Sequence, residues 1–323
     1  MRKQRSSRSL VPGMPRALLR AGPLIWLSLV GACGLPAQSL PVLEPPRAVT
    51  RISDSGLDEI SGLVASRRHP GLYYVHNDSG GGPYVHMIDR EGQTRLTIRL
   101  RGIQAVDYED IALAPGAEPG TFDVCVADIG DNDARRPHIT IYRFPEPELS
   151  ETKHATIIVT PRAYRLRYPD GPVDAEAFLV HPRTGDGYVI TKRTAGAGMV
   201  YQLPAPWDES RERELVRVGP LRLPAALLPL RIVTAADIHP DGRRFAVRCY
   251  ADGWEWWLPA DATDADFERI FDTEPVRLSL APERQGEALC YSADGKAILT
   301  VSEGNRPTLY EMPRVTPAGQ PAP

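Results

Sequence analysis

Acidic side chains recur along this sequence at the start of a repeated pattern. In VDYEDIALAP, residues 106–115, three acids fall within four residues, directly before a strand-like apolar run. Five segments share the order acid, small or apolar residues, turn and β-rich run, at intervals of 50 to 67 residues. Carboxylates placed in this way either ligate a cation or accept backbone N–H groups from the next repeat. The aligned acids, all candidate metal ligands, are Glu59, Glu109, Glu176, Asp237 and Glu287.

A second set of polar residues follows the next β-rich run of each repeat. His76 ends such a run and is a candidate general base, with a plain packed histidine as the alternative. Asp128 is the other candidate catalytic residue. Asp78 and Asp131 add carboxylates to the candidate metal ligands, although Asp131 also suits a turn. The candidate ligand-binding residues are Asn77, Lys192, Arg193 and Arg248.

The repeats predict an all-β fold. Periods of this length are typical of a β-propeller, in which each repeat forms one blade of four strands. The turns HPRTGDG, HPDG and SADG place Pro, Asp and Gly where a hairpin reverses, and His69, His181 and His239 are expected in such turns. We count five blades, with six as the alternative because the intervals between residues 109 and 237 are long. The fifth repeat lacks its fourth strand, and residues 46–54 would supply it and close the ring.

This fold would gather the polar residues in one funnel. The first strand of each blade lines the central channel and the second runs antiparallel to it, so strand starts and strand ends meet on one face. Two carboxylates about 4 Å apart repel by about 4 kcal/mol near a protein surface, so the cluster needs a counter-charge. Lys192, Arg193 and Arg248 are one source, and Ca²⁺ is the other, because the shell contains only oxygen ligands. Zn²⁺ is not expected without sulfur or paired histidine ligands.

The beginning of the chain predicts export. Residues 1–20 carry six basic residues and no acid, and PLIWLSLVGA then gives a short apolar run, which is the pattern of a signal peptide. VGAC resembles a lipobox in which Cys33 is lipidated, and plain cleavage after Ala32 is the alternative. The protein would be anchored to the bacterial envelope, on the periplasmic side or the surface, or secreted. The expected organisation is signal peptide 1–32, linker 33–45, one propeller domain 46–315 and flexible tail 316–323.

Charge and motif content argue against several classes. Without residues 1–32 the formal net charge moves from −3 to about −9, which disfavours nucleic acid as a partner. No later run is long enough to span a membrane, so a lipid anchor would be the only attachment. GxSxG, Gly-Lys-Ser/Thr, GxGxxG and CxxC motifs do not occur, which disfavours classical serine hydrolases, nucleotide-binding proteins and thiol redox proteins. Three cysteines after Cys33 indicate buried thiols, with a Cys249–Cys290 bridge as the alternative.

Five short motifs carry a resemblance to a known group. DYEDIA, ADIGDN, IYRFPEP, DAEAF and GEALCYSADG resemble secreted bacterial β-propeller proteins of the esterase-like or phytase-like type, over most of residues 55–313. The resemblance implies a Ca²⁺-assisted phosphoesterase in which the acids hold calcium and a metal-bound water attacks the substrate. Lys192, Arg193 and Arg248 would then bind an anionic phosphate. These basic residues are few, which disfavours phytate itself.

Two functions are compatible with these observations. The first is a metal-assisted hydrolase of a small phosphorylated or otherwise anionic ester. The second is a non-catalytic envelope propeller that binds a protein or a glycan, in which the acids are structural. Both are expected to be monomers, and the fold alone does not choose between them.

Overall fold

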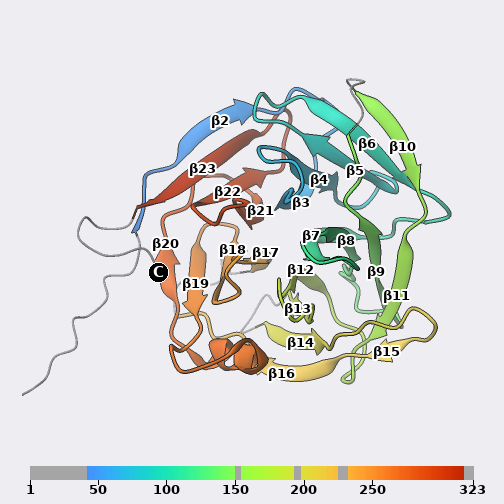
Figure 1. Ribbon diagram of the computed structural model, residues 1–323, viewed down its shortest axis with the longest axis vertical. Helices are drawn as coiled ribbons and strands as arrows, with labels where there is room; N and C mark the ends of the chain where they lie inside the picture. Colours follow the sequence, from blue (N-terminus) through green and yellow to red (C-terminus); the bar gives the residue numbers. More distant parts are fainter. Residues whose placement is uncertain (1–41, 150–153, 193–197, 225–231, 316–323) are drawn as a thin grey trace, which may run out of the picture. The chain divides into compact units, whose positions relative to one another are not determined.

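The described part of the chain is a five-bladed β-propeller. The computed structural model describes residues 42–149, 154–192, 198–224 and 232–315. These residues form five sheets placed around a central axis (Figure 1). The innermost strands contact one another in a closed cycle, so that the fifth blade packs against the first. In blade order they are β3 (Ile60–Ala65), β7 (Tyr108–Pro115), β12 (Ala175–Val180), β17 (Val233–Ile238) and β21 (Gly286–Tyr291).

Each blade continues outward from its first strand. All residues of β3, β12 and β21 are buried, because blades pack on both faces of these strands. The outer strands of blade 1 are β4 (Tyr73–Asn77), β5 (Tyr84–Ile88), β6 (Thr94–Leu100) and β10 (Ala155–Val159). The outer strands of blade 2 are β8 (Phe122–Asp128), β9 (Ile139–Pro145), β11 (Arg162–Arg167) and β15 (Arg213–Glu214). The outer strands of blade 3 are β13 (Gly187–Thr191), β14 (Met199–Leu203) and β16 (Val216–Pro220). The outer strands of blade 4 are β18 (Arg244–Cys249), β19 (Gly253–Trp257) and β20 (Val276–Leu278).

The N-terminal strand closes the ring, as the sequence predicts. Blade 5 contains β21, β22 (Ala297–Ser302) and β23 (Thr308–Val315), and its outer strand is β2 (Arg47–Arg51), which pairs antiparallel with β23. β1 (Val42–Leu43) also pairs with β23, so the blade begins earlier than the expected boundary at residue 46. The prediction of five blades is confirmed. Joining the two ends of the chain in one sheet ties the first blade to the last and covers the edge of β23.

One strand lies in a different blade from the one expected. The run ATIIV reads as part of the second repeat, but β10 pairs parallel with β6 and forms an additional outer strand of blade 1. The chain therefore leaves blade 2 after β9, crosses to blade 1 and returns to blade 2 as β11. This excursion lengthens the interval between the second and third repeats, so that interval does not contain a sixth blade.

Aromatic packing joins blades 3 and 4. Trp256 of the WEWW run stacks on Phe245, with ring centroids 4.8 Å apart, and is fully buried. The 3₁₀ segment η1 (Asp264–Asp272) places Phe267 and Phe271 against Tyr188 of blade 3. Such pairs add about 0.5–1.5 kcal/mol each beyond their buried area. The tryptophan run therefore serves blade packing.

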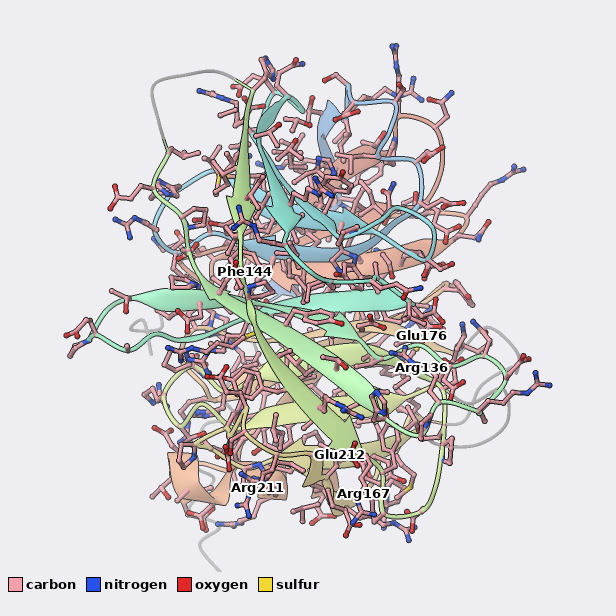
Figure 2. The ribbon with its side chains drawn as sticks, turned by 90° about the vertical axis from the view of Figure 1, so that its right-hand side faces the viewer. Arg136, Phe144, Arg167, Glu176, Arg211 and Glu212 are labelled. Atoms are coloured by element: carbon pink, nitrogen blue, oxygen red, sulfur yellow. The ribbon has the colours of Figure 1, made fainter. Side chains whose placement is uncertain are left out.

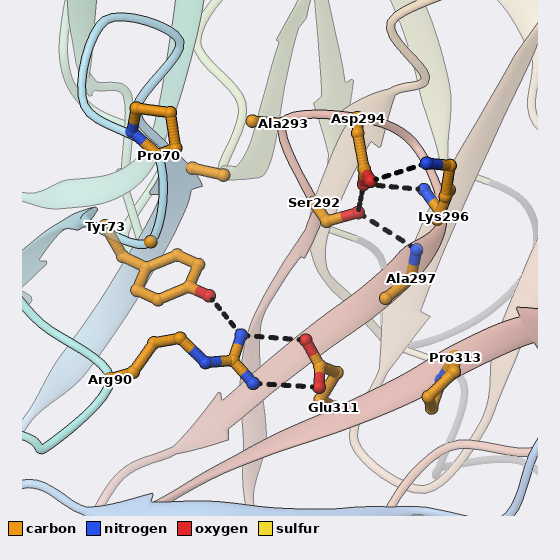
Figure 3. A pocket seen from close by; sticks show the side chains of 12 residues that line it. Pro70, Tyr73, Arg90, Ser292, Ala293, Asp294, Lys296, Ala297, Glu311 and Pro313 are labelled. Carbon is orange, nitrogen blue, oxygen red and sulfur yellow. Dashed lines mark hydrogen bonds and ion pairs between the residues drawn. The ribbon is translucent and has the colours of Figure 1, made fainter.

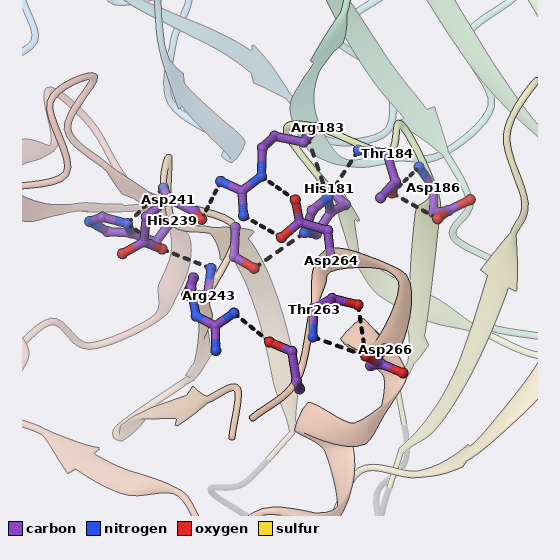
Figure 4. Close-up of polar contacts among 12 residues, drawn as sticks. His181, Arg183, Thr184, Asp186, His239, Asp241, Arg243, Thr263, Asp264 and Asp266 are labelled. Atoms are coloured by element: carbon purple, nitrogen blue, oxygen red, sulfur yellow. Dashed lines mark hydrogen bonds and ion pairs between the residues drawn. The ribbon is translucent and has the colours of Figure 1, made fainter. Parts of the chain in front are cut away.

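Histidines in the hairpin turns also tie neighbouring blades together. Nε2 of His181 in blade 3 donates to the carbonyl of Gly242 in blade 4, at 3.2 Å (Figure 4). His239 in turn donates to a turn carbonyl of blade 5 at 3.0 Å. His69 of blade 1 donates to the carbonyl of Pro147 in blade 2 at 2.9 Å. The three turn histidines thus have a second role, because each one satisfies a carbonyl of the following blade.

Two further observations complete the fold. Cys125, Cys249 and Cys290 are separate buried thiols, so the described residues contain no Cys249–Cys290 bridge. Within the described ranges, no helix has the length and apolar character needed to cross a bilayer. The predicted signal peptide, Cys33 and the tail 316–323 lie outside the described residues.

Candidate functional site

Each first strand contains a β-bulge near its beginning. In all five blades the pairing of the first strand with the second skips one residue there. A bulge takes the extra residue out of the regular ladder and re-aims its side chain, and bulges often border functional sites. The bulged residues are Ser61, Glu109, Glu176, Thr234 and Glu287.

The bulges change the alignment of the repeats. The acid pattern places Glu59 and Asp237 with the other three acids, whereas the equivalent positions in blades 1 and 4 hold Ser61 and Thr234. Both hydroxyls donate to a backbone carbonyl of a neighbouring blade, Ser61 at 2.7 Å and Thr234 at 2.8 Å. Among the five bulges, only blades 2, 3 and 5 therefore present a carboxylate, so the ring is asymmetric.

Carboxylates from blades 1, 2 and 3 converge at the bulges. Asp78, Asp107 and Glu109 can each place one oxygen within 4.8 Å of the others. Glu109, Asp174 and Glu176 form a second group of the same size, so Glu109 belongs to both. We call these two groups together the acidic funnel. Figure 2 shows Glu176 at one end of the strands, on the same side of the molecule as Arg136.

Two members of the acidic funnel are absent from the candidates drawn from the sequence. Asp107 and Asp174 each stand two residues before a bulged glutamate, in the strings DYE and DAE. Their backbone carbonyls also bond to the chain just after the second strand. The carbonyl of Asp107 accepts from the N–H of Gly130, and that of Asp174 accepts from the N–H of Lys192. The repeated Asp-x-Glu spacing was therefore the signal that could have identified them.

Lys192 is the principal counter-charge inside the acidic funnel. Its Nζ forms an ion pair with Glu176 and lies 4.0 Å from Oδ2 of Asp174. Among the described residues, no Lys or Arg forms an ion pair with Asp78, Asp107 or Glu109. The charges of Lys192 and Arg136 still act on Glu109 and Asp107, where they oppose the rise in pKa, but neither forms an ion pair there.

The pKa values of these carboxyl groups are raised accordingly. Burial, followed by the negative charges of Asp78 and Asp174, raises the pKa of Asp107 to about 6. Burial raises the pKa of Glu176 to about 7 even though Lys192 opposes the shift. The pKa of Glu109 lies well above its usual value because Glu109 is buried next to Glu176, Asp78 and Asp107. Cation binding would relieve this repulsion.

The opposite side of the mouth carries further acids. Glu287 is only 5% exposed, and burial together with the charges of Glu176 and Glu303 raises its pKa to about 8. The pKa of Glu303 is also raised, first by burial and then by Asp78 and Glu59. Tyr250, at the end of β18, has a pKa raised to about 12 by burial and by Glu287. The charges of Lys192 and Arg248 oppose the shift at Glu287.

The two candidate catalytic residues lie inside the propeller. His76 is fully buried, its Nδ1 donates to the carbonyl of Asn77 at 3.0 Å, and burial lowers its pKa. Asp128 is also fully buried, accepts N–H groups of Val106 and Asp107 at 3.1 Å each, and pairs with Arg136 at 2.7 Å. The structure brings neither residue into the two oxygen groups. Both side chains have the contacts of residues that position strands and loops.

Three other candidates are likewise engaged elsewhere. Asp131 accepts the backbone N–H groups of residues 135 and 136, as in a turn. Asp237 accepts from the backbone of Tyr291 at 2.9 Å and so connects blade 4 to blade 5. Arg248 is buried and pairs with Glu283 at 2.8 Å.

Three candidate residues remain: two are described by the structure and one is not. Glu59 is exposed at the start of β3. The side-chain amide of Asn77 donates to the carbonyl of Gly56 at 2.7 Å. Arg193 lies outside the described residues. Of the candidates, the structure therefore brings together Asp78, Glu109, Glu176 and Lys192, with Glu287 beside them.

A carboxylate that was not among the candidates connects three blades near the acidic funnel. Asp110 is fully buried, and one of its oxygens accepts from the backbone N–H of Phe178 in blade 3 at 2.9 Å and of Ala236 in blade 4 at 3.3 Å. Its other oxygen accepts from Ile111 of its own blade at 2.8 Å. One side chain thus connects the first strands of blades 2, 3 and 4.

A pocket at the opposite ends of β3 and β21 is less suited to ligand chemistry. It has a volume of about 530 Å³ and lies between blades 1 and 5 (Figure 3). Arg90 forms two bonds to Glu311, at 2.9 and 3.0 Å, and a third to the hydroxyl of Tyr73 at 3.0 Å. Lys296 pairs with Asp294 at 3.3 Å. The charged side chains of this pocket form ion pairs with one another, unlike Asp78, Asp107 and Glu109 of the acidic funnel.

Comparisons with known proteins found matches among solved structures alone. No protein-family model and no curated protein matches the sequence. Among solved structures, the WD40 repeats of RRP9 match over 79% of this chain and 67% of that chain, with 14% identity and a TM-score of 0.36. U3-55K matches over the same shares, with 14% identity and a TM-score of 0.35. At these TM-scores neither match supports a conclusion about this chain.

Proposed function

We propose that the acidic funnel binds a divalent cation, Ca²⁺, through Asp78, Asp107 and Glu109. The observation that carries the proposal is the convergence of three carboxylate oxygens within 4.8 Å, from two blades, none of them in an ion pair with a described Lys or Arg. Ca²⁺ accepts six to eight oxygen ligands in flexible geometry, and carboxylates, backbone carbonyls and water all serve. The second oxygen group is less available, because Lys192 already neutralises Glu176.

The replacement Glu109→Gln tests the cation site. It removes the carboxylate shared by the two groups, so we expect Ca²⁺ affinity to fall by at least about tenfold, because ligand charge tunes calcium affinity. It also removes a repelling charge, so the protein without metal should melt at a higher temperature than the wild type. Calorimetric titration with Ca²⁺ and melting in EDTA measure the two effects.

Glu274→Gln is the matched control, because Glu274 is an exposed carboxylate away from the acidic funnel. It should leave both quantities unchanged. Unchanged calcium affinity in Glu109→Gln, or no saturable binding to the wild type, would show that the acids are structural.

Beyond cation binding, we propose that the site hydrolyses a small phosphorylated or otherwise anionic ester; this is the finer proposal. Three protein oxygens leave coordination positions for water and substrate, and a bound cation lowers the pKa of such a water. Lys192 is partly exposed next to Glu176, so it is the described basic residue best placed to contact an anionic group of the substrate. His76 and Asp128 are buried, so they are not needed in this scheme.

Hydrolysis of p-nitrophenyl phosphate with and without Ca²⁺ tests the finer proposal. Turnover should require Ca²⁺, be lost in Glu109→Gln and fall by at least about tenfold in Lys192→Met, since a charge-assisted contact contributes about 1.5–3 kcal/mol. Calcium binding without turnover on this or other phosphoesters would favour the second function, a non-catalytic envelope propeller with a protein or glycan partner. Export through the signal peptide is part of both proposals.

A further inference from the structure

A loop of blade 2 contacts both oxygen groups of the acidic funnel. It spans residues 129–136 and directly follows the second strand β8. The N–H of Gly130 donates to the carbonyl of Asp107 at 3.2 Å, and the N–H of Asp131 donates to Oδ1 of Asp174 at 2.7 Å. One short segment of backbone is therefore bonded to a member of each oxygen group.

Gly130 lies directly against two of the carboxylates. A Cβ atom on Gly130 would come within 2.2 Å of Oε1 of Glu109 and within 2.5 Å of Oδ2 of Asp107, which is closer than non-bonded atoms approach. The φ angle of Gly130 lies outside the left-handed region that favours glycine, so the backbone conformation does not call for this residue. What the glycine provides is room for the two carboxylates.

Arg136 fixes the position of Gly130. Its guanidinium donates to the carbonyl of Gly130 at 2.6 Å and to the carbonyl of Asp128 at 3.2 Å. It also pairs with the carboxylate of Asp128 at 2.7 Å, and that carboxylate accepts the N–H of Asp107 at 3.1 Å. The guanidinium therefore holds the backbone on both sides of the close approach, at Gly130 directly and at Asp107 through Asp128.

We propose that Gly130 and Arg136 are positioning residues of the cation site, which set its calcium affinity through Asp107 and Glu109. Gly130 lets the two carboxylates keep their oxygens close together, and Arg136 holds the glycine in place beside them. This inference rests on the proposed binding of Ca²⁺ by Asp78, Asp107 and Glu109. Residues that orient metal ligands typically change metal affinity by about 10–100-fold when they are replaced.

Calorimetric titration of the full-length protein with Ca²⁺ tests the role of Gly130. Gly130→Ala should weaken calcium binding by at least about tenfold, because the added methyl group displaces both carboxylates. The displaced atoms are the ends of side chains that can rotate, so the melting temperature in EDTA should stay close to that of the wild type.

Gly219→Ala is the matched control for this variant. A Cβ atom on Gly219 meets no other atom within 4 Å, and the φ angle of Gly219 also lies outside the left-handed region. The control should therefore bind calcium as the wild type does.

Arg136→Met distinguishes positioning from a simple effect of charge. Arg136 brings a positive charge near Asp107, where it opposes the rise in pKa. By charge alone, its removal would strengthen calcium binding. Loss of the contacts to Gly130 and Asp128 should instead weaken binding by about tenfold. Arg136→Lys keeps the charge and loses the planar fork of donors, so its calcium affinity should fall between those of Arg136→Met and the wild type.

The outcomes separate this inference from the cation site itself. Absence of saturable calcium binding to the folded wild type would remove the cation site and this inference with it. Calcium binding that is equally tight in the wild type and in Gly130→Ala would overturn the role of Gly130 and leave the cation site intact. A large fall in the melting temperature of Gly130→Ala in EDTA would also overturn it, because the glycine would then serve the fold. Unchanged or tighter binding by Arg136→Met would overturn the role of Arg136.

Discussion

Replacing Asp110 with alanine is expected to lower the free energy of unfolding by about 3–5 kcal/mol, because breaking a buried charged network leaves its partners unsatisfied. The carboxylate accepts N–H groups of Ile111, Phe178 and Ala236, which belong to three different blades. Water cannot readily replace it, because the residue is fully buried. Urea unfolding followed by circular dichroism measures the loss.

Asp110→Asn is the matched variant for this experiment. The amide keeps one oxygen of the same shape and loses the charge, so the loss should be smaller than that of the alanine variant. Burial raises the pKa of Asp110 well above its usual value, opposed by hydrogen bonds from Phe178, Ile111 and Ala236, so a neutral acceptor is a reasonable substitute. Equal stability of Asp110→Ala and the wild type would mean that these three first strands are held together by packing alone.

The second large effect is on the pH dependence of stability. Without metal, the melting temperature should fall as pH rises from about 4.5 to about 8. The carboxyl pKa is raised to about 6 in Asp107, about 7 in Glu176 and about 8 in Glu287. In this window the folded protein binds more protons than the unfolded chain, so rising pH favours unfolding. One pKa unit corresponds to about 1.4 kcal/mol, so the groups together account for several kcal/mol.

Calcium should change this profile in a defined way. The ion binds deprotonated ligands, so its stabilising effect is larger at about pH 8 than at about pH 5. Melting curves in EDTA and in excess Ca²⁺ should therefore diverge as pH rises. Glu287→Gln should flatten the upper part of the EDTA profile, because it removes the highest of these carboxyl pKa values. A profile in EDTA that rises with pH would contradict the assignment of unbalanced carboxylates to the acidic funnel.

The sequence predicted more of the fold than of the site. Blade count and ring closure follow from repeats and from the unassigned strand at residues 46–54, which are local patterns. β10 was placed in the wrong blade because its partner β6 pairs with it in parallel after a long excursion, and apolar alternation does not reveal a pairing partner. The acids of blades 1 and 4 were misaligned because a bulge is a property of strand register, and Ser61 and Thr234 hold those positions.

By itself, the sequence determined that a five-bladed all-β ring would collect acids at one mouth, because hairpin turns and repeat spacing are encoded over short distances. The tertiary structure decided which acids meet. Asp78, Asp107 and Glu109 converge through bulges in two blades, whereas His76 and Asp128 turn inward and become buried. Asp110 accepts from residues 68 and 126 positions away, a relation that depends on the closed ring. Strand register sets the direction of each side chain, and neighbouring blades supply its counter-charge. Neither can be deduced from the spacing of the residues along the chain.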